Sequence, residues 1–437
     1  MGSKTDAREE IKNSPEESSS GKKDHSQSIK NKLIDLENYL SKGYDFRYNE
    51  ITNRVEFKKK TVNVYSVMNE RTFSNLKMES KIEAGINTSA ENFKDMIESN
   101  RLSKRYNPLK DFLFSLPVWD EQTDWIAEYL KQVQLIDQEK QQEHFVKSFK
   151  KWFVNLVGSL VNEKVYNENC FILVGGQGIG KTRFFMSLIP DELRMQYYYI
   201  GTFTPHNKDH EEMLGTKVII NLDELSTLNR TDIESLKSRM SQAQINLRRA
   251  YGRLPVDLNR IASFCGSINK YEFLSDQTGS RRFLPFGVEH ISNDSSVPVE
   301  NLYSQALVLF KKGFNIWFSQ QEIRELEEYN LEYKVFSIEE DQILNHYCLP
   351  DKEELAMGSY RYSTTTEIAN SLSEKYPRIN VNQTYINKLG AALYSLGFQR
   401  KTKRIDGNPL KVWLIKERFS TAMQTMNKEN EVQGSVI

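Results

Sequence analysis

The sequence feature that most constrains this chain is GGQGIGKT at residues 175–182, which matches the pattern G-x-x-x-x-G-K-[ST]. It follows the short apolar run FILVG, which predicts a buried strand, and a helix is expected over residues 181–188. Glycines allow the backbone to curl closely enough for its N–H groups to surround phosphate oxygens. The pattern therefore predicts a P-loop between a strand and a helix, rather than an incidental glycine-rich turn.

A P-loop predicts ATP and Mg²⁺ as cofactors. Lys181 is expected to neutralise the β- and γ-phosphates, and the hydroxyl of Thr182 is expected to ligate magnesium. The residues that we expect to contact the nucleotide are Gly175, Gly176, Gln177, Gly178, Ile179, Gly180, Lys181, Thr182 and Arg183.

The second half of the site is expected in KVIINLDEL at residues 217–225. Its apolar run predicts a buried strand that ends at Asp223, where a carboxylate can hold magnesium through water. Glu224 is then placed to polarise a water molecule, which indicates hydrolysis rather than transfer of phosphate to a small molecule. Alone, the pair also fits the solvated start of a loop, but a P-loop about forty residues upstream favours the catalytic interpretation.

Three further residues are candidates for catalytic contacts with the γ-phosphate. Asn269 ends the predicted strand IASFCGSIN, although Asn also ends strands at ordinary turns. Arg281 and Arg282 follow in TGSRRFLPF, and one of them would act as an arginine finger on a neighbouring subunit. The alternative for this pair is salt-bridged surface charge.

These segments together resemble the virulence-associated protein E family of phages and integrated mobile elements, whose ATPase core is similar to superfamily 3 helicases and AAA+ proteins. The resemblance covers roughly residues 36–347. It rests on GGQGIGKT, NLDEL followed by IESLKSRMS, LRRAYGR, SINKYEFLSDQTGSRRFLPF, FRYNEITNRVEF and YNPLKDFLFSLPVWD. The family implies a helicase or replication ATPase that forms a homo-oligomeric ring, a hexamer, on DNA. No primase-like acidic cluster precedes the ATPase segment, so priming would come from a separate primase.

Strands that alternate with helices predict an α/β fold with a mostly parallel sheet. The expected architecture is a P-loop NTPase core of the AAA+ or superfamily 3 type, with a mostly helical N-terminal domain and a C-terminal winged-helix domain. The expected boundaries are a disordered segment at 1–28, an N-terminal α+β or helical domain at 29–120, the ATPase core with flanking helices at 121–350, a winged-helix-like domain at 351–418 and a flexible tail at 419–437.

Within these boundaries, hydrophobic periodicity predicts individual elements. We expect a helix from about Ile29 to Gly43, a hairpin in FRYNEITNRVEFKKK with its turn near Thr52-Asn53, and helices over 73–102 with a break near Gly85. Apolar residues at helical spacing predict helices from Trp125 to Leu160, and after Pro285 helices are expected over Leu302–Lys312 and Gln321–Tyr347.

The region of about residues 360–416 has its own pattern. Ser363-Thr364-Thr365 can cap one helix, and a second helix is expected over 383–396, ending at Gly397. FQRKTKRI and PLKVWLI then predict two strands joined by Asp406-Gly407-Asn408. Two helices followed by a hairpin are typical of a winged helix, a fold that binds DNA or proteins.

Two basic segments are candidates for binding the DNA backbone without reading its sequence. Both fit solvated surface charge as the alternative. The candidate DNA-binding residues are Arg248, Arg249, Tyr251 and Arg253 in LKSRMSQAQINLRRAYGR, and Arg400, Lys401, Lys403 and Arg404 on the predicted wing.

The remaining composition excludes several classes of protein. The formal net charge is zero, so only local charge can indicate a partner. The three cysteines are sparse, and Cys170 and Cys265 stand in apolar runs, which suits small core residues in a reducing compartment. No secretory h-region or bilayer-length apolar segment is seen, so we expect a cytoplasmic protein without a membrane partner. The competing interpretations are a DNA-translocating helicase and an ATP-switched initiator or loader that does not unwind DNA.

Overall fold

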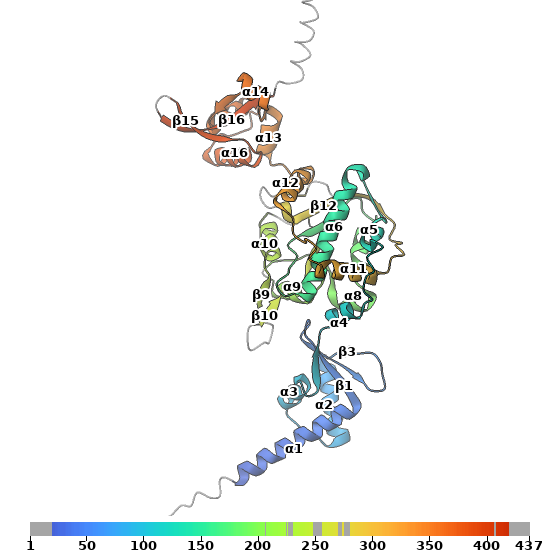
Figure 1. Ribbon diagram of the computed structural model, residues 1–437. Helices are drawn as coiled ribbons and strands as arrows, with labels where there is room; N and C mark the ends of the chain where they lie inside the picture. The colour runs from blue at the N-terminus through green and yellow to red at the C-terminus, as the bar shows by residue number, and fades with distance from the viewer. Residues whose placement is uncertain are drawn as a thin grey trace, which may run out of the picture. The chain divides into compact units, whose positions relative to one another are not determined.

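The computed structural model describes residues 20–205, 207–223, 225, 230–247, 256–269, 273–274, 280–405 and 408–418. The chain is a mixed α/β protein that divides into two compact units, Met1–Val118 and Trp119–Ile437 (Figure 1). Several separate sheets are present, and each unit has its own buried apolar cluster.

The first unit combines a small sheet with helices. Its sheet has the order β3-β2-β1-β4, in which β1 pairs antiparallel with β2 and parallel with β4. Leu36 and Leu40 from the first helix, Leu76 from the second and Phe93 from the third pack against apolar residues of β1 and β2. The elements are α1 Ser20–Gly43, β1 Tyr44–Asn49, β2 Arg54–Lys59, β3 Ser66–Val67, α2 Glu70–Ala84, α3 Ala90–Glu98, β4 Ser103–Tyr106 and α4 Pro108–Ser115.

The expected hairpin and helix break of this unit are confirmed. Asn53 takes a left-handed backbone conformation in the turn between β1 and β2, with φ 53°, and Gly85 ends α2 with φ 67°. Two features differ from expectation. Helix α1 begins at Ser20 rather than near Ile29, so residues 20–28 of the segment expected to be disordered are helical; they extend a helix that Leu36 and Leu40 anchor in the core. Strand β4 was not expected, because its residues Ser103–Tyr106 are polar and show no apolar alternation.

The second unit is built on a six-stranded sheet with the order β5-β12-β6-β11-β8-β7. Every pair of neighbours is parallel except β5 with β12, so the expectation of a mostly parallel sheet is confirmed. The elements up to residue 333 are α5 Trp125–Leu130, β5 Val133–Leu135, α6 Gln138–Val161, β6 Cys170–Val174, α7 Lys181–Met186, α8 Asp191–Tyr197, β7 Tyr198–Gly201, α9 Lys208–Thr216, β8 Ile219–Asp223, α10 Arg230–Met240, β9 Gln244–Leu247, β10 Val256–Asn259, β11 Ser263–Ile268, η2 Ser280–Arg282, β12 Phe283–Ile291, α11 Val299–Lys311, α12 Gln320–Tyr329 and η3 Asn330–Tyr333.

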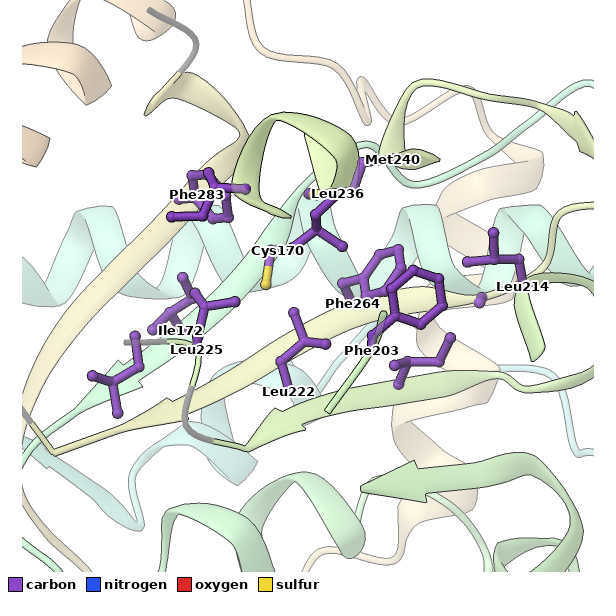
Figure 2. Close-up of a cluster of buried hydrophobic side chains, with 14 of the residues drawn as sticks. Cys170, Ile172, Phe203, Leu214, Leu222, Leu225, Leu236, Met240, Phe264 and Phe283 are labelled. Atoms are coloured by element: carbon purple, nitrogen blue, oxygen red, sulfur yellow. The ribbon is translucent and has the colours of Figure 1, made fainter. Parts of the chain in front are cut away.

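Helices cover both faces of this sheet. On one face, Leu236 and Met240 of α10 pack in the same cluster as Cys170, Leu222 and Phe264 from the strands (Figure 2). On the other face, the aromatic side chains of α6 contact the strand residue Phe171 and the α7 residues Phe184 and Phe185; the α6 residues are Phe145, Phe149 and Trp152. Cys170 and Cys265 are fully buried free thiols, as expected for core residues.

Two strands of the sheet correct the sequence interpretation. Val133–Leu135 is strand β5, although Val133 continued the helical spacing of Ile126 and Leu130. Strand β12 spans Phe283–Ile291, where no strand was expected; the helix expected over 302–312 is α11, and α12 begins the stretch expected to be helical over 321–347. Both strands gain their hydrogen bonds from distant segments, so local periodicity could not show them.

The last part of the unit contains α13 Ile338–His346, β13 Tyr347–Cys348, α14 Lys352–Met357, β14 Arg361–Ser363, α15 Thr365–Lys375, α16 Gln383–Ser395, β15 Arg400–Ile405 and β16 Asn408–Glu417. The predicted helices and the pairing of the hairpin strands are confirmed, and Thr364 caps α15 in a reciprocal arrangement with Glu367. The expected turn residues Asp406 and Gly407 lie outside the described part of the chain. The apolar cluster of this C-terminal part includes Ile343 and Tyr347 as well as Trp413. The cluster therefore begins before residue 351, where the domain boundary was expected. Among the described residues, no helix combines the length and apolar character needed to cross a bilayer.

Candidate functional site

Three neighbouring strands of the second unit bring their carboxyl ends to one edge of the sheet. Strand β11 lies between β6 and β8 and is parallel to both, with Ile268 beside Val174 and Ser267 beside Asp223. The glycine-rich loop follows β6, Asn269 follows β11, and Asp223 ends β8. The predicted residues of this set are therefore brought together, although they lie up to about ninety positions apart in the sequence.

Lys181 occupies the centre of this edge. Its side chain is nearly buried, with 6% of the residue exposed, and Nζ donates hydrogen bonds to the carbonyls of Gly175 at 2.8 Å and Gly176 at 2.6 Å. A third bond runs from Nζ to Oδ1 of Asn269 at 3.0 Å. The structure thus links the first residue of α7 directly to the end of β11. In the sequence, only its place at the end of a predicted strand indicates a role for Asn269.

The loop conformation explains why glycines stand where they do. Gly178 and Gly180 have φ values of 82° and 98°, which side chains rarely tolerate. A Cβ atom on Gly175 would lie 2.3 Å from the carbonyl oxygen of Val288 on β12, so the loop passes against a neighbouring strand with no room for a side chain. The backbone is therefore held in one tight path between β6 and α7.

The electrostatics of the edge follow from burial and from one carboxylate. Burial lowers the pKa of Lys181, and the negative charge of Asp223 opposes that shift. Asp223 and Thr182 are both exposed at this edge. An ammonium group, a hydroxyl, a carboxylate and backbone amides in one place suit a ligand that carries phosphate together with a hard cation. The donor set on the described residues therefore fits phosphate oxygens and a divalent cation.

Asn293 contacts the loop and was missed by the sequence interpretation. It follows β12, has a left-handed φ of 53°, and its Nδ2 donates to the carbonyls of Gly180 at 3.3 Å and Ile291 at 3.2 Å. A Cβ atom on Gly180 would lie only 2.0 Å from that nitrogen. Asn is among the residues that tolerate this backbone region, and it is followed here by a polar run, which is a weak sequence signal.

Arg281 and Arg282 do not reach this edge in their own chain. They precede β12, whose first residue Phe283 lies beside Cys170 at the start of β6. The opposite edge of the sheet is therefore roughly 15 Å from the glycine-rich loop, at about 3.3 Å per strand residue. Arg281 is exposed, whereas Arg282 donates to Oγ of Ser241 at 2.8 Å and 3.1 Å.

Several predicted residues lie outside the described part of the chain. These are Glu224, Arg248, Arg249, Tyr251 and Arg253. The last four of these residues lie in the sequence between β9 and β10. These two strands pair with each other in an antiparallel ladder. Lys237 and Arg239 of the same basic segment pair with Glu234 and Glu211.

The basic residues of the predicted wing are on β15, and all four are exposed: Arg400, Lys401, Lys403 and Arg404. Two of them lie against aromatic rings. The guanidinium of Arg400 lies 5.3 Å from the ring centre of Trp413, and Nζ of Lys403 lies 3.5 Å from that of Tyr362. Each contact places the charged group itself over an aromatic ring, while the residue remains exposed to solvent.

The family model of the virulence-associated protein E-like domain matches residues 113–335, just over half of the chain. The chain therefore belongs to the virulence-associated protein E-like family. No curated protein sequence matches it.

Two similar solved structures are both of the C-terminal region of NrS-1. The apo structure of its residues 305–718 has 13% identity and a TM-score of 0.47, and covers 89% of this chain and 99% of that one. The A form of the apo region has 13% identity and a TM-score of 0.46, and covers 88% of this chain and 99% of that one.

Proposed function

We propose that this protein is an ATP-hydrolysing replication ATPase of the helicase type, which acts on the DNA of a phage or mobile element. The observation that carries the proposal is the position of Lys181. Its ammonium group lies between the glycine-rich loop and Asn269, at the sheet edge that also holds Asp223. Membership of the virulence-associated protein E-like family supports the replication context.

In this proposal the loop is a P-loop that holds ATP and Mg²⁺. Lys181 exchanges the carbonyls of Gly175 and Gly176 for phosphate oxygens, which a stronger charge-assisted bond favours. Thr182 and Asp223 hold the magnesium ion, which neutralises charge on the phosphates. Asn269 stays in contact with Lys181 and so positions its ammonium group.

Hydrolysis needs a base, and Glu224 is the residue assigned to it. Glu224 follows the exposed end of β8 in the sequence, directly after Asp223. A carboxylate there accepts a proton from the attacking water. A Lys181→Ala variant should lose nucleotide binding, whereas Glu224→Gln should bind nucleotide and lose turnover; an unchanged turnover in Glu224→Gln would refute the assignment.

Ring formation is proposed from the position of the arginine pair. Arg281 and Arg282 lie at the sheet edge opposite their own loop, so an arginine finger has to act on another subunit. Mixing Lys181→Ala subunits with subunits that carry Arg281→Ala and Arg282→Ala should restore some ATPase activity at interfaces with both intact groups. A monomer with full specific activity would exclude the ring.

DNA contacts are proposed for two elements. The order of α13, β14, α15, α16, β15 and β16 supports a winged helix, with the basic strand β15 as its wing. Arg248, Arg249, Tyr251 and Arg253 would grip the backbone inside the ring. A separate primase would supply primers.

The alternative proposal is an initiator or loader that uses ATP to remodel protein–DNA partners without unwinding. The same loop and wing support it, because nucleotide binding and duplex docking are common to both functions. Strand displacement on a forked DNA substrate distinguishes them: ATP-dependent release of a labelled strand is expected for the helicase, and stable binding without release for the loader.

A further inference from the structure

A cavity of about 320 Å³ lies beside the glycine-rich loop and has no role in the site described above. Its volume is in the range of small-molecule sites, which begins at about 300 Å³. Three segments that are distant in sequence build it: the end of α5, the connection from α7 into α8, and the chain that follows β12. The lining residues are Tyr129, Gln132, Ser187, Ile189, Pro190, Asp191, Glu192, Arg194, Asn293, Ser295, Val297, Val299 and Glu300.

Asn293 joins this cavity to the loop. It lines the cavity, and its Nδ2 donates to the carbonyl of Gly180 immediately before Lys181. Its Oδ1 is buried and has no hydrogen-bond partner among the described residues. A buried amide oxygen without a donor is costly, so a ligand group that donates a hydrogen bond near Asn293 would be favoured.

The strand order gives the direction of a bound nucleotide. Strand β6 lies between β11 and β12, so Asn269 and Asp223 lie on one side of the loop and Asn293 on the other. A nucleotide whose terminal phosphate lies toward Asn269 and Asp223 extends its other end toward β12. The cavity is on that side.

The charge of the lining shows which part of a nucleotide fits. Glu192, Glu300 and Asp191 are acidic, and Arg194 already pairs with Asp191 and donates to the carbonyls of Met186 and Ile189. Carboxylates repel phosphate but accept hydrogen bonds from ribose hydroxyls and from exocyclic amino groups. The lining therefore suits the uncharged, donor-rich half of a nucleotide.

We infer that this cavity holds the nucleoside of the bound nucleotide, with Asn293 positioning the glycine-rich loop against it. The inference rests on the proposed function, because it assumes that the phosphates bind at Lys181. It adds a second half to the site, built by segments that carry no phosphate-binding pattern, and it predicts that affinity for a nucleotide is divided between the loop and the cavity.

A pair of neighbouring serines provides the test. Ser295 lines the cavity, whereas Ser296 is exposed and does not. In the full chain, Ser295→Trp should fill the cavity and weaken Mg²⁺–ADP binding at least about tenfold in calorimetry, or about 1.4 kcal/mol. Binding of magnesium tripolyphosphate, which has no nucleoside, should be unchanged. Ser296→Trp should bind both ligands as the wild type does.

Two controls separate the failure of this inference from that of the proposed function. Lys181→Ala should weaken binding of both ligands; if it weakens neither, the proposed phosphate site is wrong. If Lys181→Ala weakens both but Ser295→Trp binds ADP as Ser296→Trp does, only the cavity assignment is overturned.

Photolabelling of the wild-type protein with 8-azido-ATP gives a measurement that needs no variant to fold. The label should be found in peptides that contain residues 129–132, 187–194 or 293–300. Labelling confined to other peptides would overturn the assignment.

Discussion

Lys181 and the basic residues of β15 are both positive groups assigned to phosphate, yet their surroundings differ. Lys181 is 6% exposed and is held by three oxygen acceptors within 3.0 Å. The four basic residues of β15 are exposed, and Arg400 and Lys403 among them lie against aromatic rings. A fixed, buried cation can select one phosphate geometry, whereas an exposed row attracts a long polyanion through charge that salt screens.

The largest effect expected from this difference is at Lys181. Lys181→Ala should weaken Mg²⁺–ATP binding by about a thousandfold, or ~4 kcal/mol, because a buried charge-assisted contact is removed. Calorimetry measures the change. Lys131→Ala is the control: Lys131 is exposed and pairs with Glu128, so this variant should bind ATP as the wild type does. If the two variants bind ATP equally well, the buried Lys181 contributes no more to nucleotide binding than an exposed lysine does.

The next effect separates binding from turnover. Glu224→Gln should keep ATP affinity and lower the hydrolysis rate by about a hundredfold or more, since a positioned base is lost. Steady-state phosphate release and ATP titration, measured on the same preparation, test this. A variant that loses affinity as well would show that Glu224 holds the loop or the metal rather than the water.

The third prediction tests whether the loop backbone creates the fixed site. Gly180→Ala should destabilise the protein by about 2–3 kcal/mol and weaken ATP binding, because its φ of 98° and the nearby Asn293 leave no place for a methyl group. Gly178→Ala has a similar φ of 82° but open space around it, so a loss of about 1 kcal/mol is expected. Urea unfolding and ATP titration of both variants measure the difference. Equal losses would mean that the contact with Asn293 is unimportant.

The smallest effect is expected at the exposed row. Replacing Lys401 and Arg404 by Gln should weaken duplex DNA binding by about tenfold, and the log–log salt slope should fall by roughly one for each phosphate that the variant no longer neutralises. ATP affinity should stay unchanged. Fluorescence anisotropy over a range of salt concentrations measures the slope.

Lys77 and Lys81 of α2 provide the matched control, since their replacement by Gln removes the same charge from the other unit. If the control double variant lowers the slope equally, β15 has no special role in DNA binding.

Local signals predicted those elements whose structure depends on neighbouring residues. The glycine-rich turn between β6 and α7, the N-cap of α15 and the pairing of β15 with β16 agree with the prediction, since glycines and a Thr364–Glu367 capping pair act within a few residues. Strands β5 and β12 were missed, because Val133 fits helical spacing and Pro285 normally interrupts a strand. Their strand conformation comes from pairing with each other and with β6.

The sequence by itself determined the family, the glycine-rich loop and the order in which Lys181, Asp223 and Asn269 follow buried strands, because each of these depends on local chemistry. Only the tertiary structure decided that β11 lies between β6 and β8, which brings Asn269 within 3.0 Å of Lys181. It also decided that Asn293 lies against Gly180 and that Arg281 and Arg282 lie at the far edge. The physical reason is that strand order is set by long-range pairing and burial, and these leave no local pattern in the chain.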